Sequence, residues 1–388
     1  MFIVAERIHQ PMLSTLMLLS NPYRPDPRVL REARALIGAD VTVRLVAWDR
    51  DGGRPSPSTE EGVEVLRVGP RASYRSVSEV VPGLLRFWYR AFRIARNLDF
   101  DVVHCHDFDT LPLGVLLARL RRKPLILDAH DIYSLMIVGE SSIAGRMLWP
   151  LERCMASKAD VLITTNEAMA GMLSAKRTKS SVIVRNSPDL SALAGSTIED
   201  TRKRHGLAGF VVSYFGSLEP GRAVEELATS FSTDDGISVI IGGSGTLQSV
   251  VEKASESSSV VRFLGNIETD EVLKITCASD LIPVMYDPSN PKYRICTPIK
   301  VLEAMACGKP VVAAKGLDIS EMIERVGCGF VIDYSRENLA RTVREASKSS
   351  GELQEMGKRG KAHFEKNLAW ETSRSALLGV YRALGGLT

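Results

Sequence analysis

A lysine and a glutamate three residues apart, Lys300 and Glu303, lie in the segment 297–313, which reads TPIKVLEAMACGKPVVA. The spacing predicts one face of a helix that begins at Pro298, ends near Gly308 and is followed by a strand. An ammonium group suits a phosphate, and a carboxylate suits the hydroxyls of a ribose. A surface pair has the same spacing, but the many small residues of the segment favour close packing beside a ligand.

Two further segments have the composition of anion-binding turns. Arg222 follows a strand that ends in glycine, within GSLEPGRAV (216–224), where its guanidinium and the N–H groups of a helix start would face an anion. An exposed loop arginine is an equal alternative. Gly243 lies in the run GGSG (242–245), but Gln248 stands where a dinucleotide-binding pattern needs its last glycine, so a dinucleotide site is not expected.

Histidines and aspartates end two apolar runs of the first half. His104, His106 and Asp107 end one run, and His130 with Asp131 ends another. Strand residues two apart share a face, so the first two histidines would point the same way. No set of further ligands with a recognised spacing accompanies them, so a polar strand end is favoured over a metal site. His130 is the better candidate for substrate contact, and its alternative is a partly buried structural histidine.

These residues follow apolar runs that alternate with amphipathic helices. The expected strands lie at 15–20, 41–48, 63–68, 102–107, 125–130, 161–166 and 182–186 in the first half, and at 210–215, 239–242, 260–264, 281–285, 310–313 and 330–332 in the second. Such strands predict parallel sheets covered on both faces, which bind ligands at the carboxyl ends of their strands.

Two α/β domains are therefore expected, with a linker in the small, polar and charged segment 188–206. The predicted bounds are 12–190 for the first domain, 205–370 for the second and 371–388 for a closing helix. The N-terminal helix of the first domain is predicted at 27–37, with Asp26 as N-cap and a proline just inside.

The composition is that of a globular protein: of 388 residues, 45% are hydrophobic, and the net charge is +3. The first half is mildly basic, which suits phosphate-bearing substrates and is too weak for a nucleic-acid-binding protein. No apolar run is long enough for a membrane span, and no signal peptide is recognised. We expect a cytoplasmic protein, with residues 1–11 as a dispensable extension and Met12 as the natural start.

Six cysteines occur without any C-x-x-C pair, and they are expected to be small buried hydrophobes in a reducing compartment.

The helix predicted at 79–97 is basic and aromatic. Its apolar face consists of Val81, Leu84, Leu85, Trp88, Phe92 and Ala95, and its other face of Arg86, Arg90, Arg93 and Asn97. A helix that packs its apolar face into the core is the favoured interpretation. The alternative is a peripheral contact with the inner face of a membrane that carries a lipid-linked acceptor.

Taken together, several segments resemble the retaining GT-B glycosyltransferases usually called family four, or glycosyl transferases group 1. The strongest is KVLEAMACGKPVVA (300–313). The others are VRFLGNIETDEVLKITCASDLIPVMY (261–286), YFGSLEPGRAVEEL (214–227), ITTNEAMAGML (163–173), VIVRNSPD (182–189), DPRVLREARAL (26–36), DVVHCHDFDTLPLG (101–114) and PLILDAHD (124–131). The resemblance implies two Rossmann-like domains that face a central cleft, with the acceptor bound by the first and a nucleotide-sugar by the second. It also implies that the last helix crosses back onto the first domain.

The resemblance implies a role for individual residues. Glu303 matches the glutamate that holds the donor ribose, Arg222 the basic residue that binds the diphosphate, and His130 a histidine close to the transferred sugar. The segment 263–266 matches the place where the base of the donor packs in the family. The donor-binding residues that we predict are Arg222, Gly243, Phe263, Asn266, Thr297, Pro298, Lys300 and Glu303. The predicted catalytic residues are His130, Arg222 and Lys300, and the predicted acceptor-binding residues are Arg28, His106, Asp107 and Asp131.

The chain departs from the family pattern at three places. Ile295 stands where the earlier glutamate of a pair normally touches the donor sugar, and Ser217 replaces another basic residue of the diphosphate site. NPYRPDPR (21–28) replaces the usual glycine-rich turn. Lys300 supplies the missing charge in our interpretation, and DPRV together with P-x-K marks a subgroup of the family.

The expected reaction is transfer of a sugar from a UDP- or GDP-linked donor to a glycan, lipid-linked or small-molecule acceptor, with retention and with no metal or other cofactor. Arg222, Lys300 and the helix start near Pro298 would stabilise the departing diphosphate. Two alternatives stay open: a degenerate, non-catalytic GT-B protein that binds nucleotide-sugar or a partner enzyme, and a nucleotide-sugar epimerase.

Overall fold

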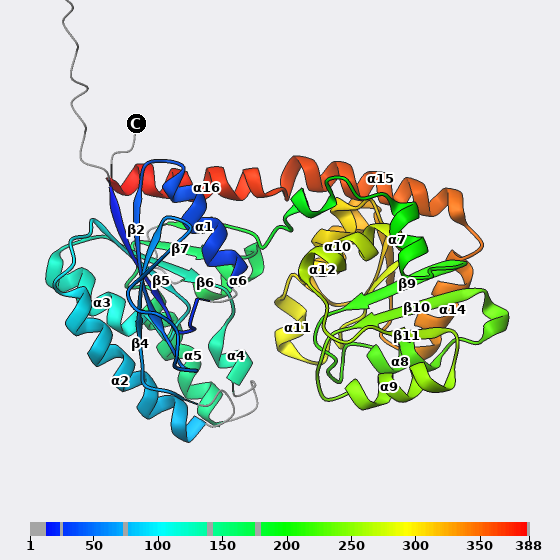
Figure 1. Cartoon of the computed structure of the whole chain (residues 1–388), viewed down its shortest axis with the longest axis horizontal. Coiled ribbons are helices and arrows are strands. Elements are labelled where there is room, and N and C mark those ends of the chain that lie inside the picture. Colours follow the sequence, from blue (N-terminus) through cyan, green and yellow to red (C-terminus); the bar gives the residue numbers. More distant parts are fainter. Residues whose placement is uncertain (1–12, 24–25, 73–76, 138–142, 175–179, 386–388) are drawn as a thin grey trace, which may run out of the picture. The chain divides into compact units, whose positions relative to one another are not determined.

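The computed structural model describes residues 13–23, 26–72, 77–137, 143–174 and 180–385, and these divide into two compact units (Figure 1). The first unit contains the described residues up to Arg185 together with those from Ser373 onward. The second unit is Asn186–Thr372. The segment 188–206, where the sequence places the linker, belongs to the second unit and contains the 3-10 helix η1 (Leu190–Leu193) and helix α7 (Ile198–Arg204).

An eight-stranded sheet forms the centre of the first unit, in the order β3-β4-β2-β1-β5-β6-β7-β8. Its strands are β1 (Ser14–Leu19), β2 (Thr42–Trp48), β3 (Ser58–Glu60), β4 (Val63–Val68), β5 (Val102–His106), β6 (Leu125–Ala129), β7 (Val161–Thr164) and β8 (Ser181–Ile183). Only the pair β3–β4 is antiparallel among these strands. Every residue of β5 and β6 is buried, as their continuous apolar runs predict. Because β1 lies between β2 and β5, the winding reverses there, and a crevice is expected at the carboxyl ends of β1 and β5.

The helices of the first unit are α1 (Pro27–Ile37), α2 (Val77–Ala95), α3 (Leu111–Arg121), α4 (Tyr133–Ile137), α5 (Ile143–Ala156), α6 (Glu167–Leu173) and, for all but its first residues, α16 (Trp370–Gly385). The predicted start of α1 is confirmed, since the Asp26 side chain accepts a hydrogen bond of 3.0 Å from Val29 N and Pro27 is the first helical residue. Helix α3 packs against α2 on one side and against α5 on the other.

Helix α2 turns a different face to the core from the one that the sequence predicts. Phe87 is fully buried and stacks on Trp48 at a centroid distance of 5.4 Å. A Cβ on Gly83 would lie 2.9 Å from the Trp48 ring, so the indole requires a glycine there. The prediction that Val81 and Leu85 face the core is wrong, because this packing leaves them 52% and 57% exposed.

Helix α16 is tied to the strands of the first unit. The Tyr381 hydroxyl is fully buried, 3.0 Å from Thr15 Oγ1 and 2.9 Å from His104 Nδ1. At the start of the helix, Ser373 Oγ accepts a hydrogen bond of 2.9 Å from Arg185 N. The closing helix therefore supplies a side chain to the polar interior behind β1 and β5.

The second unit is built on two three-stranded parallel sheets, β11-β10-β9 and β12-β13-β14. Their strands are β9 (Phe210–Phe215), β10 (Ile237–Gly242), β11 (Val261–Phe263), β12 (Ile282–Val284), β13 (Val311–Ala314) and β14 (Gly329–Ile332). A parallel bridge between Val212 and Leu281 joins the edge of the first sheet to the start of β12. The winding reverses between β9 and β12, which makes the carboxyl ends of these two strands the expected ligand crevice.

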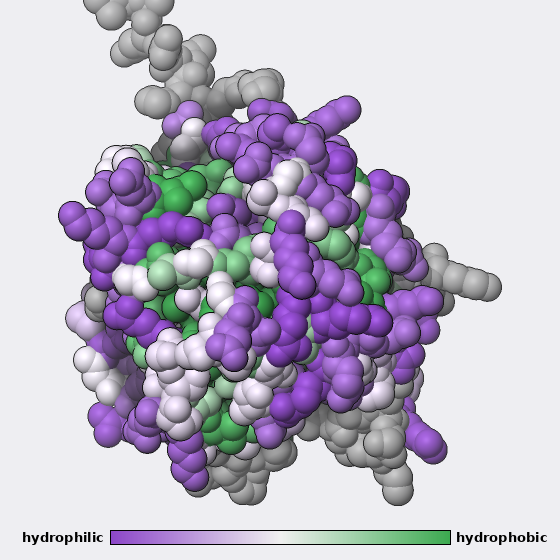
Figure 2. Space-filling model, turned by 90° about the vertical axis from the view of Figure 1, so that its right-hand side faces the viewer, coloured by the Kyte–Doolittle hydropathy of each residue, from purple (hydrophilic) through white to green (hydrophobic). Residues whose placement is uncertain are grey.

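The helices of the second unit, besides η1 and α7, are α8 (Val224–Thr229), η2 (Thr233–Asp235), α9 (Gln248–Ser257), α10 (Thr269–Ala278), α11 (Pro291–Ile295), α12 (Ile299–Ala306), α13 (Asp318–Val326), α14 (Arg336–Ala346) and α15 (Ser350–Asn367). The face of the molecule in Figure 2 is covered largely by hydrophilic side chains, with hydrophobic areas between them. Among the helices that the structure describes, none combines the length and apolar character needed to cross a bilayer.

The cysteines differ in part from the expectation. Cys277 and Cys307 form a disulfide with an S–S distance of 2.13 Å, so the prediction that all six cysteines are reduced is wrong. The two residues meet because α10 packs against α12, which the sequence spacing alone does not reveal. Cys105 and Cys328 are buried as expected, whereas Cys154 is exposed.

Candidate functional site

Lys300 lies on α12 with its ammonium group against aromatic rings at the carboxyl ends of β9 and β12. Its Nζ is 3.4 Å from the ring centroid of Tyr214 and 5.5 Å from that of Tyr286. The residue is only 6% exposed, and among the described residues Nζ has no hydrogen-bond partner. Burial, and after it the charge of Arg222, hold the pKa of Lys300 well below its usual value. An anion bound beside this buried amine would favour its charged form.

Arg222 lies beside Lys300, on the loop between β9 and α8. Its guanidinium carbon is 5.0 Å from the Tyr286 centroid and 5.2 Å from the Tyr293 centroid, and Nε donates a hydrogen bond of 3.2 Å to Tyr293 Oη. Aromatic faces stabilise a cation without neutralising it. In the part of the chain that the structure describes, no carboxylate forms a salt bridge with Arg222 or Lys300. Arg222 and Lys300 thus share Tyr286 as a neighbour, and no described carboxylate competes with an incoming anion for them.

Glu303 lies one turn after Lys300 on the same helix and is buried. Burial raises the pKa of Glu303 to about 7, although the Lys300 charge lowers it. The helix begins at Ile299, with buried Pro298 as its N-cap and the partly buried Thr297 before it. The predicted helix, with its lysine and glutamate on one buried side, is therefore present.

Glycine turns line the carboxyl ends of β9, β10 and β11. Gly243 has a φ of +131°, and a Cβ there would lie 1.9 Å from Gly216 O, so only glycine fits. Gly243 N donates a hydrogen bond of 2.8 Å to Gly265 O, which links the turns after β10 and β11. Phe263, at the end of β11, is partly buried, and Asn266, in the turn after it, is exposed.

In the first unit, His130 is held between two carboxylates. Its Nε2 is 2.9 Å from Asp128 Oδ2, and its Nδ1 is 3.4 Å from Asp107 Oδ2. Its backbone N–H donates to Asp107 Oδ1 at 2.8 Å. Burial opposes the charge, but Asp107 and Asp128 raise the pKa of His130 to about 10. Both ring nitrogens of His130 therefore face carboxylate oxygens, an arrangement that favours the imidazolium form.

Asp128, on β6, is the shared acceptor of this cluster. Its oxygens accept from Arg28 Nε at 2.8 Å and from Arg28 Nη2 at 2.5 Å, and Oδ2 lies 3.2 Å from His106 Nδ1. Burial would raise the pKa of Asp128, but the Arg28 and His130 charges hold it well below its usual value. Arg28 also donates to Val184 O at 2.7 Å, so this predicted acceptor-binding residue is engaged inside the unit.

The cluster continues inward through residues that the sequence did not indicate as functional. His104 stacks on His106 at a centroid distance of 4.6 Å, and its Nε2 lies 3.9 Å from Glu32 Oε2. Burial and the Asp128 charge raise the pKa of Glu32 to about 8. Glu32 follows Arg28 by one helical turn, which is a signal that sequence inspection can use. Tyr381 gives no such signal, since it lies 277 residues from His104.

Four buried side chains of this cluster, Glu32, His104, His106 and Asp128, turn one ligand-type atom each to within 4.8 Å of one another. This is a set that a metal ion can use. The Arg28 guanidinium, however, lies 2.5 Å from Asp128 and 3.2 Å from Glu32. Because Arg28 already balances these carboxylates, a cation would have to displace it, and we assign the site no metal.

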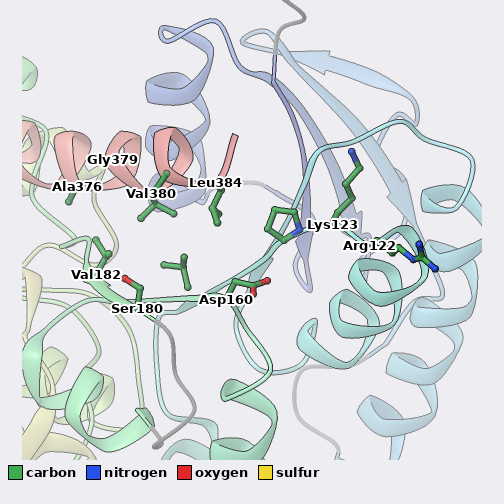
Figure 3. Close-up of a pocket in the computed structure, with 12 residues that line it drawn as sticks. Arg122, Lys123, Asp160, Ser180, Val182, Ala376, Gly379, Val380 and Leu384 are labelled. Atoms are coloured by element: carbon green, nitrogen blue, oxygen red, sulfur yellow. The ribbon is translucent and has the colours of Figure 1, made fainter. Parts of the chain in front are cut away.

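Two hollows lie away from these clusters. The larger, of about 760 Å³, is lined by α16 and by the amino ends of β6, β7 and β8, the strand ends opposite to those that carry His106 and His130 (Figure 3). The smaller, of about 600 Å³, is lined by Ala194, Gly195, Ser196, Asp200, Lys203, Arg204 and Lys274. Neither contains a residue that the sequence predicts to be functional.

Each of the two units matches a known protein family. Residues 25–187 match the family described as glycosyl transferase 4-like domain, and residues 197–363 match glycosyl transferases group 1. The chain is a glycosyltransferase of the GT-B fold, with a 4-like domain in its first unit and a group 1 domain in its second.

The relatives of this glycosyltransferase are also named as glycosyltransferases. The D-inositol 3-phosphate glycosyltransferase of Salinispora arenicola is 25% identical over 91% of this chain and 85% of its own length. That of Mycolicibacterium smegmatis is 27% identical over 73% of this chain and 67% of its own length. Both are named as transferases, which does not favour the non-catalytic or epimerase alternatives.

Solved structures share the fold. Sucrose-phosphate synthase from Thermosynechococcus elongatus has a TM-score of 0.78 at 16% identity and covers 97% of this chain and 100% of its own. The Anabaena protein HepE in complex with UDP-glucose has a TM-score of 0.71 at 18% identity, over 95% of this chain and 100% of its own. The expected GT-B fold of two parallel-sheet α/β units is confirmed.

The glycosyltransferase thus groups its sequence-predicted residues into one constellation per unit. Arg222, Lys300 and Glu303 lie around the carboxyl ends of β9 and β12. Arg28, His106, Asp107 and His130 surround Asp128, and Asp131 follows His130 at a half-buried position. The residues missed were those that hold the others: Asp128, Tyr214, Tyr286 and Tyr293. Tyrosines that pack against cations leave no periodic pattern in the sequence, so these residues can be recognised only in the folded structure.

Proposed function

We propose that the glycosyltransferase transfers a sugar with retention from a UDP- or GDP-linked donor to a glycan, lipid-linked or small-molecule acceptor. The observation that carries the proposal is the pair of cations at the β9 and β12 ends. Lys300 is buried without a hydrogen-bond partner in the described chain, and Arg222 is held by a tyrosine face and not by an acid. A diphosphate supplies the anion that both lack. The neighbour HepE, solved with UDP and with UDP-glucose, supports a nucleotide-sugar as the ligand.

The proposed donor contacts follow from where each group lies. Lys300 and Arg222 bind the diphosphate, and the buried Glu303 accepts hydrogen bonds from the ribose hydroxyls. The turns at Gly243 and Asn266, with Phe263, border the base. Ile295 cannot hydrogen-bond sugar hydroxyls through its side chain, so the sugar is held by other groups.

The first unit is proposed to bind the acceptor and the sugar being transferred. His130 acts there as a fixed positive charge and not as a base, because both its nitrogens face carboxylates. Asp107 and the half-buried Asp131 offer oxygens to acceptor hydroxyls. Arg28 and His106 position Asp128, which in turn orients His130.

The proposed reaction breaks the bond between the anomeric carbon and the diphosphate and forms one to the acceptor oxygen on the same face. The leaving phosphate oxygen takes the acceptor proton. Charge that develops on the diphosphate is met by Lys300 and Arg222, in a site arranged before reaction, so the chemistry needs no metal or other cofactor.

Thermal-shift titration with UDP, GDP, ADP and NAD tests the donor assignment, because a ligand that binds only the folded state raises Tm. The expected result is a rise with one nucleoside diphosphate that Arg222→Ala loses and that Arg325→Ala, an exposed arginine elsewhere in the same unit, keeps. A rise with NAD alone would contradict the proposal. Turnover of the matching nucleotide-sugar that disappears in Glu303→Ala would exclude a non-catalytic protein.

A further inference from the structure

Ten large hydrophobic side chains are exposed in the part of the chain that the structure describes, and seven of them lie on three helices of the first unit. They are Val81, Leu85 and Tyr89 on α2, Leu116 and Leu120 on α3, and Met147 and Leu151 on α5. Exposure reaches 64% at Tyr89 and 72% at Met147. Single exposed apolar residues need no explanation, but a concentration of them on neighbouring elements indicates an interaction surface.

The three helices form a continuous layer. Helix α3 packs against α2 and against α5, and all three lie beside the sheet of the first unit (Figure 1). On each helix the exposed apolar residues are four apart, so they form a row on one side of that helix. Helix α3, LPLGVLLARLR, is apolar on both sides: Leu113 and Leu117 face the core, and Leu116 and Leu120 face outward. The outward side of α3 thus carries apolar residues where a solvent-exposed helix normally carries polar ones.

The charge of this layer has one sign. Its exposed charged residues are arginines: Arg86, Arg90, Arg93, Arg119, Arg146 and Arg153. Among the side chains that the structure describes on the three helices, the acidic one is Glu152, and it is buried, accepting hydrogen bonds from Tyr133 N at 2.8 Å and Ser134 N at 3.0 Å. Among the described side chains of these helices, therefore, no exposed carboxylate is available to neutralise the arginines.

We propose that the α2–α3–α5 layer docks on the surface of a bilayer that contains anionic phospholipids. The rows of apolar side chains enter the boundary between head groups and acyl chains, and the arginines bind lipid phosphates. Charge complementarity selects this occupant, since an uncharged apolar partner would leave six exposed arginines unused. Membrane docking through this surface does not depend on the donor site. For the proposed function, membrane docking favours a lipid-linked acceptor, which the bilayer would present to the first unit.

Vesicle flotation of the full-length protein tests the proposal, with phosphatidylcholine alone and with phosphatidylcholine mixed with phosphatidylglycerol. The test variants are the triple Arg86→Gln, Arg90→Gln, Arg93→Gln and the pair Leu85→Ser, Leu120→Ser. The control triple Lys348→Gln, Lys361→Gln, Lys366→Gln removes the same charge from exposed positions of the second unit. Each sample is also titrated with the nucleoside diphosphate that stabilises the wild type, which reports folding and the donor site separately.

We expect the wild type to float with the anionic vesicles, less so at high salt. The arginine triple should lower its partition by on the order of 100-fold, since each basic residue near such a surface contributes about five-fold. The leucine pair should lower partition at high and low salt alike, and the control triple should leave it unchanged. Equal losses in the control triple would overturn the proposal. So would the absence of flotation together with self-association that the leucine pair abolishes, because the layer would then be an interface between copies of the chain.

Discussion

The ammonium nitrogen of Lys300 lies 3.4 Å from the ring centroid of Tyr214, on the buried side of α12. The aromatic face stabilises the charge only in part, because burial still holds the pKa of Lys300 well below its usual value. A diphosphate bound here would raise the pKa of Lys300, since an opposite charge favours the protonated amine. Binding of the donor and protonation of Lys300 are therefore expected to be linked.

Nucleoside diphosphate binding should take up a proton through Lys300. The free protein carries a depressed lysine pKa and the complex a raised one, so affinity falls as pH rises through the window between them. Calorimetry in buffers of different ionisation enthalpy measures this uptake. Lys300→Met should abolish it, and Glu303→Gln should keep it. A binding enthalpy that is the same in every buffer would rule out the linkage.

Glu303→Ala should weaken UDP binding and leave pyrophosphate binding unchanged, because only UDP carries the ribose that the carboxylate is proposed to hold. Hydrogen bonds to a charged group contribute about 1.5–3 kcal/mol, which corresponds to roughly 10- to 100-fold in affinity. The two dissociation constants can be measured on the same protein samples. A parallel loss for both ligands would instead mean that the substitution disturbs Lys300, its neighbour on α12.

Asp128→Asn should destabilise the first unit, because Asp128 is the counter-charge of the buried Arg28 and His130. Breaking a buried ion pair by removing one partner costs about 3–5 kcal/mol. Glu355→Gln makes the same change in an exposed pair, with Lys358 Nζ at 2.7 Å, and should leave the free energy of unfolding almost unchanged because solvent screens that pair. Urea unfolding compares the two variants, and equal midpoints would contradict the assigned role of Asp128.

The charge of His130 should stabilise the protein at neutral pH and lose this effect in alkali. The folded-state pKa of about 10 lies above the ordinary 6.5, so the stabilisation is complete below about 6.5 and disappears as pH rises through 10. The difference in unfolding free energy between wild type and His130→Gln should shrink over this range. Titration of the His130 ring signals by NMR gives an independent value, and a midpoint near 6.5 would show that Asp107 and Asp128 do not act on the ring as inferred.

The sequence predicts well what depends on local pattern. Continuous apolar runs predict the parallel strands, and Asp26 with Pro27 predicts the start of α1. The lysine and glutamate of α12 share a buried side, as their spacing indicates. The roles proposed for Arg222 and Glu303 come from the resemblance to a family, because spacing alone does not supply them.

What the sequence does not reveal depends on contacts between distant elements. Tyr381 reaches His104 across 277 residues, and Cys277 meets Cys307 only because α10 and α12 pack together. The prediction of which face of α2 packs on the core is also wrong, because the helical spacing allows more than one apolar face. The stacking of Phe87 on Trp48 selects the face around Gly83 and leaves Val81 and Leu85 outside.

The dissociation constant of the preferred nucleoside diphosphate, compared between wild type and Lys300→Met, is the most direct test of the donor site. Methionine fills a similar volume without charge, so the tyrosine contacts can persist while the anion loses its buried partner. We predict a loss of affinity of about 10- to 100-fold, as expected for a charged hydrogen bond, with partial recovery in Lys300→Arg. Equal affinity in wild type and Lys300→Met would contradict the assignment of the diphosphate to the Lys300 and Arg222 pair.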